Sequence, residues 1–179
     1  MMYLKWAALG PLSLFMSILG RLLAPVLPFF VQGDGYLPQW LWWFQTPDND
    51  CDGDEGHWDR HPGTDWWSTY KRRVAWFWRN VCYGFDIDVL GAKCRLTDTL
   101  ELSGDPETDN SPLHSGWCYR ELKRDGKAIY FQLYFVYAYP WTKKRCLRGN
   151  LGWKLWDFPT KYLTCQWTGM INPLFGAEE

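Results

Sequence analysis

The spacing of apolar residues changes once along this chain, and the change limits the folds that the chain can adopt. After the turn at Pro62-Gly63, apolar residues recur at helical spacing, which predicts a helix capped by Thr64 and ending near Gly84. The predicted core face of this helix consists of Trp67, Tyr70, Val74, Trp78 and Val81. From Phe85 onward the period is two, which is typical of strands.

The second half of the chain is predicted to form a sheet. The expected strands cover residues 85–90, 96–102, 115–123, 128–139, 146–156 and 162–168. Asp125-Gly126 has the composition of a hairpin turn, and strands joined by short turns pair antiparallel. The predicted fold class is α+β: an antiparallel β-meander of about five or six strands packed by one amphipathic helix, with an apolar N-terminal helix.

Composition divides the chain into three segments. Residues 1–45 are apolar and aromatic and are predicted to associate with a membrane or to pack against protein, residues 46–64 form an acidic loop, and residues 65–179 form the α+β body. A chain of 179 residues can bury one good core, so a single domain with a terminal segment is expected.

The N-terminal segment is almost wholly apolar from Tyr3 to Val31. Small or polar residues recur in it at steps of three and four: Gly10, Ser13, Ser17, Arg21 and Ala24. The helix that this spacing predicts has a narrow seam of these residues and a wide apolar face. Such a helix can lie in a membrane interface with Arg21 reaching the headgroups, or pack its seam against another helix. We predict membrane association, peripheral or as a single pass; the alternative is a core helix or a homo-oligomer contact.

Tryptophans follow this segment within a few residues of one another. Such residues favour the boundary between a bilayer and water, so they fit an interfacial anchor, although a lid on the core would have the same composition. The predicted membrane or partner contacts are Phe15, Leu19, Arg21, Trp40, Trp42 and Trp43.

Carboxylates dominate the segment after the tryptophans. Counted from Asp48, the pattern D-x-D-x-D-G with a carboxylate at the twelfth position matches most of the template of a calcium-binding loop. The candidate ligands for Ca²⁺ or another divalent cation are Asp48, Asp50, Asp52, Asp54 and Asp59. Glu55 replaces the usual apolar residue of the template, and the flanking prolines do not predict a helix pair, so a solvated acidic loop is the favoured alternative.

The acidic segment also contains two histidines. His57 and His61 lie four residues apart beside Cys51, a spacing that would suit zinc on a helix, but Gly56 and the Pro-Gly turn after His61 disfavour a helix there. A metal-dependent hydrolase would use Asp48, Asp50, Asp52 and His57. The sequence has no HExxH, GxSxG or phosphate-binding glycine loop, so no catalytic residue is predicted and a non-enzymatic function is favoured.

The charges of the chain nearly balance. A formal net charge of -1 argues against general binding of nucleic acid, because a neutral protein has no net field that holds phosphates. The basic side of the predicted helix is expected to neutralise the acidic loop and carries Lys71, Arg72, Arg73 and Arg79.

Six cysteines show no CxxC pair and are predicted to be buried thiols. If the body were exported, pairs among Cys118, Cys146 and Cys165 could bridge neighbouring strands.

Three motifs occur in a specific order: TPDN, then RN-x-x-YGF, then GWK. Their order and the apolar start of the chain resemble an uncharacterised family of tailed-bacteriophage proteins with a domain of unknown function. The matching positions are Asp48, Asn49, Arg79, Asn80, Tyr83, Gly84, Gly152, Trp153 and Lys154. The resemblance implies a phage origin and expression inside a bacterial host, and it implies no activity.

Three functions follow as hypotheses. The first is a non-enzymatic phage accessory protein that associates with the host inner membrane and binds an unidentified protein partner. The second is a structural component of the virion, with the apolar segment buried between subunits. The third is the divalent-metal-dependent hydrolase.

Overall fold

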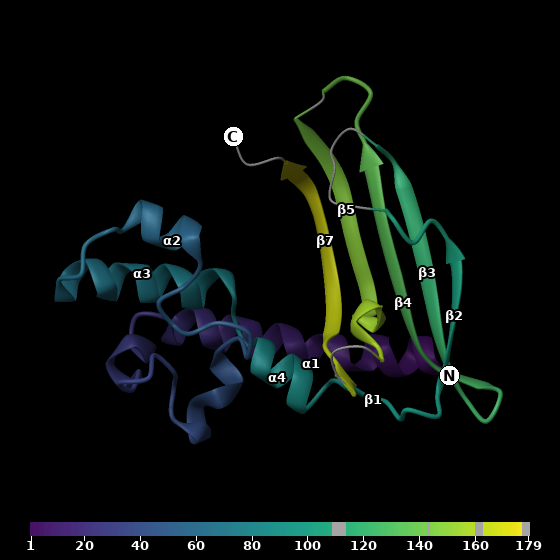
Figure 1. The fold of residues 1–179 in the computed structure, drawn as a ribbon, viewed down its shortest axis with the longest axis horizontal. Helices are drawn as coiled ribbons and strands as arrows, with labels where there is room; N and C mark the ends of the chain where they lie inside the picture. The colour runs from purple at the N-terminus through teal and green to yellow at the C-terminus, as the bar shows by residue number, and fades with distance from the viewer. Residues whose placement is uncertain (109–113, 143, 160–162, 177–179) are drawn as a thin grey trace. The chain divides into compact units, whose positions relative to one another are not determined.

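The computed structural model describes residues 1–108, 114–142, 144–159 and 163–176. Its fold is α+β, as the sequence predicts (Figure 1). The chain forms two compact units that differ from the three segments defined by composition. Residues 1–10 and 91–179 make up one, here named the sheet unit, and residues 11–90 make up the other, here named the helical unit.

The sheet unit contains a five-stranded antiparallel sheet with the strand order β2-β3-β4-β5-β7. These strands are β2 (Thr99–Gly104), β3 (Gly116–Arg124), β4 (Lys127–Ala138), β5 (Arg145–Trp153) and β7 (Trp167–Gly176). A separate two-stranded ladder pairs β1 (Ala92–Lys93) with β6 (Thr164–Cys165). Asp125 and Gly126 both have positive φ, 51° and 74°, which confirms the predicted hairpin turn between β3 and β4.

The core of the sheet unit is aromatic. Trp153 is fully buried and its ring meets Tyr130 at 4.8 Å and Phe131 at 6.0 Å between centroids. Helix α1 (Met2–Leu23) begins in this unit, and its first turns place Tyr3 and Trp6 against Phe131, at 4.6 and 5.8 Å. The short 3-10 helix η3 (Leu155–Asp157) follows β5.

Most of the predicted strands are confirmed with shifted ends. Strands β2 to β5 overlap the four predictions from 96–102 to 146–156. The prediction for 162–168 contains β6 and the start of β7, and its first residue lies outside the described part of the chain. The continuation of β7 to Gly176 was missed because Pro173 interrupts the strand pattern, yet β7 is an edge strand of the sheet, where a proline is tolerated.

The strand predicted for residues 85–90 is wrong. This stretch belongs to helix α4 (Tyr83–Asp88), which starts after Cys82 in the left-handed region at φ 58°. A period of two over six residues is too short to exclude one helical turn. Gly84 lies so close to residues 42–45 that an added Cβ would be 2.5 Å from the Trp42 carbonyl oxygen, and its N–H donates to the Gln45 carbonyl at 2.8 Å.

The helical unit contains the rest of α1 and several short helices. They are η1 (Leu27–Phe30), η2 (Gln39–Phe44), α2 (Glu55–Arg60), α3 (Trp66–Arg79) and α4. Helix α1 ends before Pro25, as the prolines predict. The buried apolar cluster of the unit comprises Ala24, Leu27, Leu37, Leu41, Cys51 and Phe77.

The predicted helix after residue 64 exists, but its predicted core face is only partly confirmed: Val81 is buried and Tyr70 and Val74 are half-buried, whereas the two tryptophans of that face are exposed. Asp65, not Thr64, caps α3 by accepting the N–H groups of residues 67 and 68. Trp67 and Trp78 are 54% and 57% exposed, whereas Arg72 is buried. The other buried residues of α3 are Trp76 and Phe77. The helix is rotated relative to the prediction because its basic side turns inward to the acidic loop.

All six cysteines are free and buried, which confirms the prediction of buried thiols. The bridges that were considered among Cys118, Cys146 and Cys165 are not formed. Burial raises the pKa of the Cys51 and Cys82 thiols to about 12 each, so both are unreactive at neutral pH.

Candidate functional site

The seam of α1 packs closely inside the helical unit. Ser13 donates a hydrogen bond of 2.9 Å to Asp86, and the Cys82 thiol donates to the Met16 carbonyl at 3.1 Å. A Cβ at Gly20 would lie 2.6 Å from the Cys82 sulfur, so only glycine allows this approach. Of the predicted seam, Ser13 and Ala24 are buried, and Gly20, which the predicted seam did not include, is buried as well.

The opposite side of α1 is apolar and exposed. Four residues at steps of three or four form it and are here named the outer stripe: Leu12, Phe15, Ile18 and Leu22. Their exposed fractions are 43%, 61%, 52% and 73%. An amphipathic helix of a water-soluble protein turns its apolar face inward, so α1 has the opposite arrangement along the helical unit.

The remaining predicted contact residues fall into two groups. Trp40 and Trp43 on η2 are exposed, at 70% and 46%. Leu19, Arg21 and Trp42 are half-buried. Arg21 donates a hydrogen bond of 3.3 Å to the Ser17 carbonyl of its own helix. The Trp40 ring meets Phe30 at 5.6 Å, and the Trp43 ring meets Phe85 at 5.5 Å.

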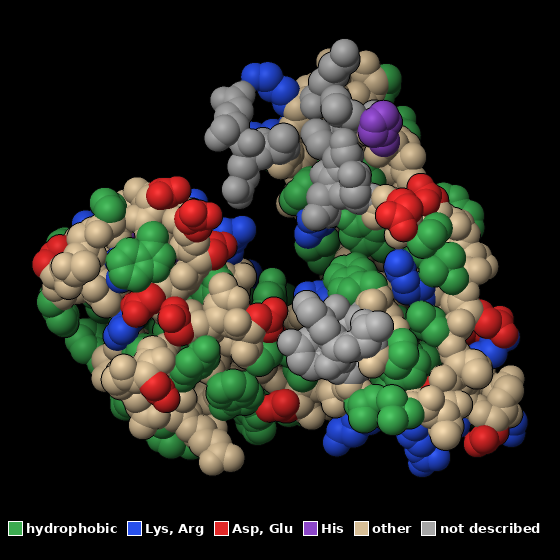
Figure 2. Space-filling model, viewed as in Figure 1, with side chains coloured by type: hydrophobic (Ala, Val, Ile, Leu, Met, Phe, Trp, Pro, Cys, Tyr) green, Lys and Arg blue, Asp and Glu red, His purple; other side chains and the backbone are tan. Residues whose placement is uncertain are grey.

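Helix α3 also carries exposed aromatic rings, and the sequence did not predict their exposure. Trp66 is 66% exposed, and its ring stacks on Tyr70 at 5.4 Å. Phe29 on η1 lies 5.6 Å from Tyr70 and 6.5 Å from Trp66. Hydrophobic side chains and carboxylates share the visible surface of the helical unit (Figure 2). The helical period placed Trp67 in the core, and no signal in the sequence marked the aromatic side as the outer one.

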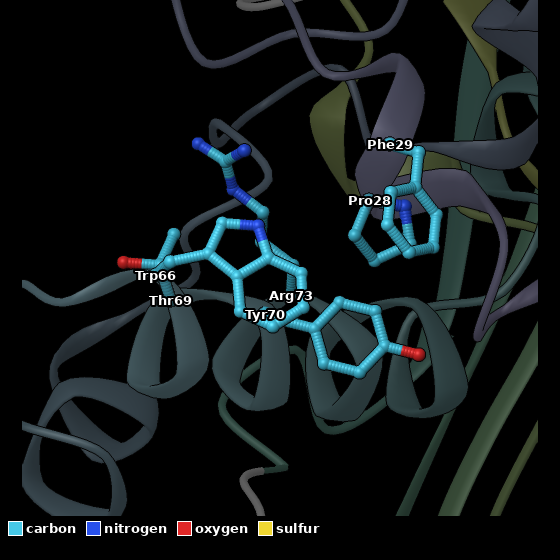
Figure 3. Close-up of a pocket in the computed structure, with 6 residues that line it drawn as sticks. All are labelled: Pro28, Phe29, Trp66, Thr69, Tyr70 and Arg73. Atoms are coloured by element: carbon cyan, nitrogen blue, oxygen red, sulfur yellow. The ribbon is translucent and has the colours of Figure 1, made fainter.

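These rings border a small pocket of about 210 Å³ (Figure 3). Its lining consists of Pro28, Phe29, Trp66, Thr69, Tyr70 and Arg73.

The acidic loop is neutralised by α3, as predicted. Arg73 donates from Nε to Asp52 at 2.7 Å and from Nη2 at 3.3 Å, and Arg72 lies 3.8 Å from the same carboxylate. Arg79 lies 3.5 Å from Asp54. These carboxylates therefore face guanidinium groups of the helix that follows them.

Asp54 also begins α2, a helix that the sequence disfavoured. Its side chain accepts the N–H of His57 at 3.2 Å and meets the His57 Nδ1 at 2.6 Å. The hydrogen bond from His57 holds the pKa of Asp54 below its usual value. This cap stabilises a short helix despite Gly56, and the helix ends before His61.

The carboxylates proposed as metal ligands are not gathered at one point. Asp50 accepts the N–H of Asp52 at 2.9 Å, whereas Asp48 and Asp59 are exposed. In the part of the chain that the structure describes, no three His, Cys, Asp or Glu side chains are placed to hold a metal ion. Binding of Ca²⁺ or another divalent cation stays a prediction.

Arg72 is fully buried beneath this loop. It donates to the His61 carbonyl at 2.7 Å and to the Gly63 carbonyl at 3.2 Å, and its guanidinium lies 3.4 Å from the ring centroid of Trp58. A cation therefore occupies the interior of the helical unit, where α3 was expected to bury tryptophan.

The motif residues have structural positions. Asn80 is the C-cap of α3, and Tyr83 and Gly84 begin α4. Gly152 has φ 106° and lies against the Phe131 carbonyl, where no other residue fits. Lys154 donates to Gln166 at 2.6 Å. Asp48 and Asn49 precede Asp52 and Asp54 in the acidic loop.

Comparison with known protein families gives one match. The model of a family of unknown function (DUF7338) matches residues 1–177. Comparisons with curated proteins and with solved structures found no match.

Proposed function

The chain belongs to this family of unknown function, and we propose on that premise that it is a non-enzymatic accessory protein that attaches to a membrane and binds a protein partner. We further propose that it comes from a tailed bacteriophage and that the membrane is the inner membrane of the host. The order of the TPDN, RN-x-x-YGF and GWK motifs supports the phage origin.

The observation that carries the membrane proposal is the inverted arrangement of α1. Of its buried residues, Ser13, Met16 and Gly20, only Met16 has a large apolar side chain, whereas its outer stripe is apolar and exposed. Full burial of one large apolar side chain contributes about 1.5 kcal/mol or more, and the four residues of the outer stripe are on average a little over half exposed, so their transfer into the interface provides about 3 kcal/mol or more. Only 17% of the most apolar window of α1 is buried, whereas a core helix would be mostly buried.

Attachment along the surface agrees better with the contacts of α1 than a spanning helix. The 22 residues are long enough to cross a bilayer. However, Trp6 donates from its indole N–H to the Thr168 carbonyl at 2.8 Å, and Ser13 holds Asp86. A spanning helix would release both contacts, but a helix in the plane of the interface keeps them.

A row across the sheet supports a protein partner. Trp117, Phe135, Gly149 and Ile171 are direct neighbours on β3, β4, β5 and β7. Trp117 and Ile171 are 52% and 61% exposed, and Phe135 is half-buried. An exposed apolar row of this kind suits contact with another protein surface.

Flotation of the full-length chain with vesicles of phosphatidylethanolamine and phosphatidylglycerol tests the membrane proposal. The wild type is expected to float, and the double variant Phe15→Ser, Ile18→Ser is expected to stay largely unbound. Leu96→Ser is the matched control because Leu96 is 75% exposed outside the outer stripe. A wild type that stays in the dense fraction refutes membrane attachment, and recovery of the chain in purified phage particles would favour a virion component instead.

A further inference from the structure

The pocket in the helical unit has two chemically different sides. Figure 3 shows Pro28 and Phe29 on one side and the Arg73 guanidinium on the other, with the rings of Trp66 and Tyr70 between them. A ligand that fills this space must combine an apolar part with a group that accepts hydrogen bonds. A volume of about 210 Å³ is that of a small group rather than of a folded partner.

The apolar side of the pocket is formed by the segment that follows α1 in the chain. Phe29 follows the outer stripe after one short turn of chain and is 64% exposed. The Tyr70 hydroxyl donates to the Pro25 carbonyl at 3.0 Å, which ties α3 to the segment that follows α1. Tryptophan and tyrosine are enriched at headgroup level, where an apolar ring and a polar edge are both satisfied.

The polar side is oriented before any ligand arrives. Asp52 occupies Nε and Nη2 of Arg73, and no described residue accepts a hydrogen bond from Nη1. Asp52 also lies 3.8 Å from Arg72, so two guanidinium groups share one carboxylate and this group of three carries one net positive charge. A fixed guanidinium with a remaining donor is well suited to a phosphate oxygen.

We propose that this pocket binds the headgroup of a phospholipid, with the phosphate at Arg73 Nη1 and the glycerol and first methylene groups against Phe29 and Trp66. The inference rests on the proposed membrane attachment and adds a lipid site to it. The phosphate is that of a lipid rather than a free anion because half of the pocket lining is aromatic and two of these rings, Phe29 and Trp66, are largely exposed.

Calorimetric titration of the full-length protein with dihexanoylphosphatidylglycerol, below the concentration at which it forms micelles, tests this site. We expect saturable binding by the wild type and a loss of at least about tenfold in affinity for Arg73→Gln, because a charge-assisted hydrogen bond is removed. Lys71→Gln is the matched control: it removes the same charge from α3, but Lys71 lies over Trp67 at 5.7 Å and not in the pocket.

A second variant covers the case in which Arg73→Gln disturbs the Asp52 pair. Phe29→Ser leaves that pair intact and is expected to weaken binding several-fold. Absence of binding by the wild type, an equal loss in Lys71→Gln, or equally tight binding of inorganic phosphate overturns the proposal. The variant Phe15→Ser, Ile18→Ser should keep monomeric lipid binding, so flotation and titration can fail separately. For the wild type, absence of flotation with intact titration contradicts only the membrane proposal, and flotation without binding in the titration contradicts only the pocket.

Discussion

The two largest fully buried side chains among the described residues are Trp153 in the sheet unit and Arg72 in the helical unit. Beneath β4 the interior is filled by an aromatic ring, as expected of a protein in water. Helix α3 buries a guanidinium bound to backbone carbonyls and near a carboxylate together with Trp76 and Phe77, while its other tryptophans, Trp66, Trp67 and Trp78, are exposed. The sheet unit therefore buries its largest aromatic ring, whereas the helical unit buries a cation and exposes several aromatic rings.

The largest loss of stability is expected from a substitution in the core of the sheet unit. Trp153→Ala should lower the free energy of unfolding by about 4 kcal/mol, because it removes a buried aromatic ring and leaves a cavity. Urea unfolding followed by circular dichroism measures the change. Trp156→Ala, at a position 41% exposed, is the control and should cost clearly less. Equal losses would show that Trp153 is not the centre of this core.

In the helical unit the corresponding residue is a cation. Arg72→Met keeps most of the side-chain volume but leaves the His61 and Gly63 carbonyls without their donor, so a loss of about 2 to 3 kcal/mol is expected. Asp52 still accepts a hydrogen bond from Arg73, which limits the loss of stability. Arg60→Met, at an exposed position on α2, should change stability by less than about 0.5 kcal/mol. A stabilised Arg72→Met variant would contradict the assigned role of the buried guanidinium.

A substitution at Gly20 tests the close packing on the buried side of α1. Gly20→Ala adds a methyl group that meets Val81 and Cys82, and the resulting overpacking should cost about 1.5 kcal/mol. Gly10→Ala in the same helix meets only the Trp167 ring at 3.8 Å, an ordinary contact, and should be neutral or stabilising. If thermal melting shows the two variants to be equivalent, the seam is not tightly packed.

The smallest effect depends on pH and concerns the sheet unit. Asp98, whose side chain is buried, accepts two hydrogen bonds from Arg124 at 2.7 and 2.8 Å, and these bonds hold the pKa of Asp98 below its usual value. A lowered pKa in the folded state contributes stability above the unfolded value of about 3.9, and this contribution is lost as the pH falls through the folded pKa.

The free energy of unfolding of the wild type should therefore fall as the pH decreases below about 4, and Asp98→Asn should fall less steeply. Urea titrations between neutral and acidic pH measure the slopes. Glu107→Gln, at an exposed position, should follow the wild type. An Asp98→Asn slope identical to that of the wild type would exclude a folded-state role for this carboxylate.

The sheet unit and the helical unit also differ in how much of their structure the sequence could predict. In the sheet unit, alternation located β3 to β5, which contain buried residues, because side chains of a strand point to the two faces of a sheet in turn. Strand β2 is exposed apart from the half-buried Leu100. The hairpin at Asp125-Gly126 was predictable for a similar reason, since both residues tolerate positive φ. Strand alternation and turn composition were therefore sufficient to predict these elements.

In the helical unit the sequence predicted the elements but not their orientation. The spacing of Trp67 and Trp78 identifies an apolar side of α3, and the basic residues identify the other side, but the period does not say which side meets the protein. The ion pairs of Asp52 decide it, and they depend on a turn of the loop that has no sequence signature. Of the predicted contact residues, Phe15, Trp40 and Trp43 are exposed, whereas the pocket at Arg73 requires two segments whose proximity only the fold reveals.

We propose that the outer stripe faces lipid, and collision measurements on a spin label test this contact. A nitroxide attached at Ile18→Cys in the full-length chain, with the buried native cysteines as background, is mixed with vesicles of phosphatidylethanolamine and phosphatidylglycerol. We predict that the label at position 18 collides more with oxygen, which dissolves in lipid, than with a water-soluble nickel complex, and that a label at Arg60→Cys shows the reverse. Equal access of nickel to both positions in the presence of vesicles would contradict lipid contact at the outer stripe.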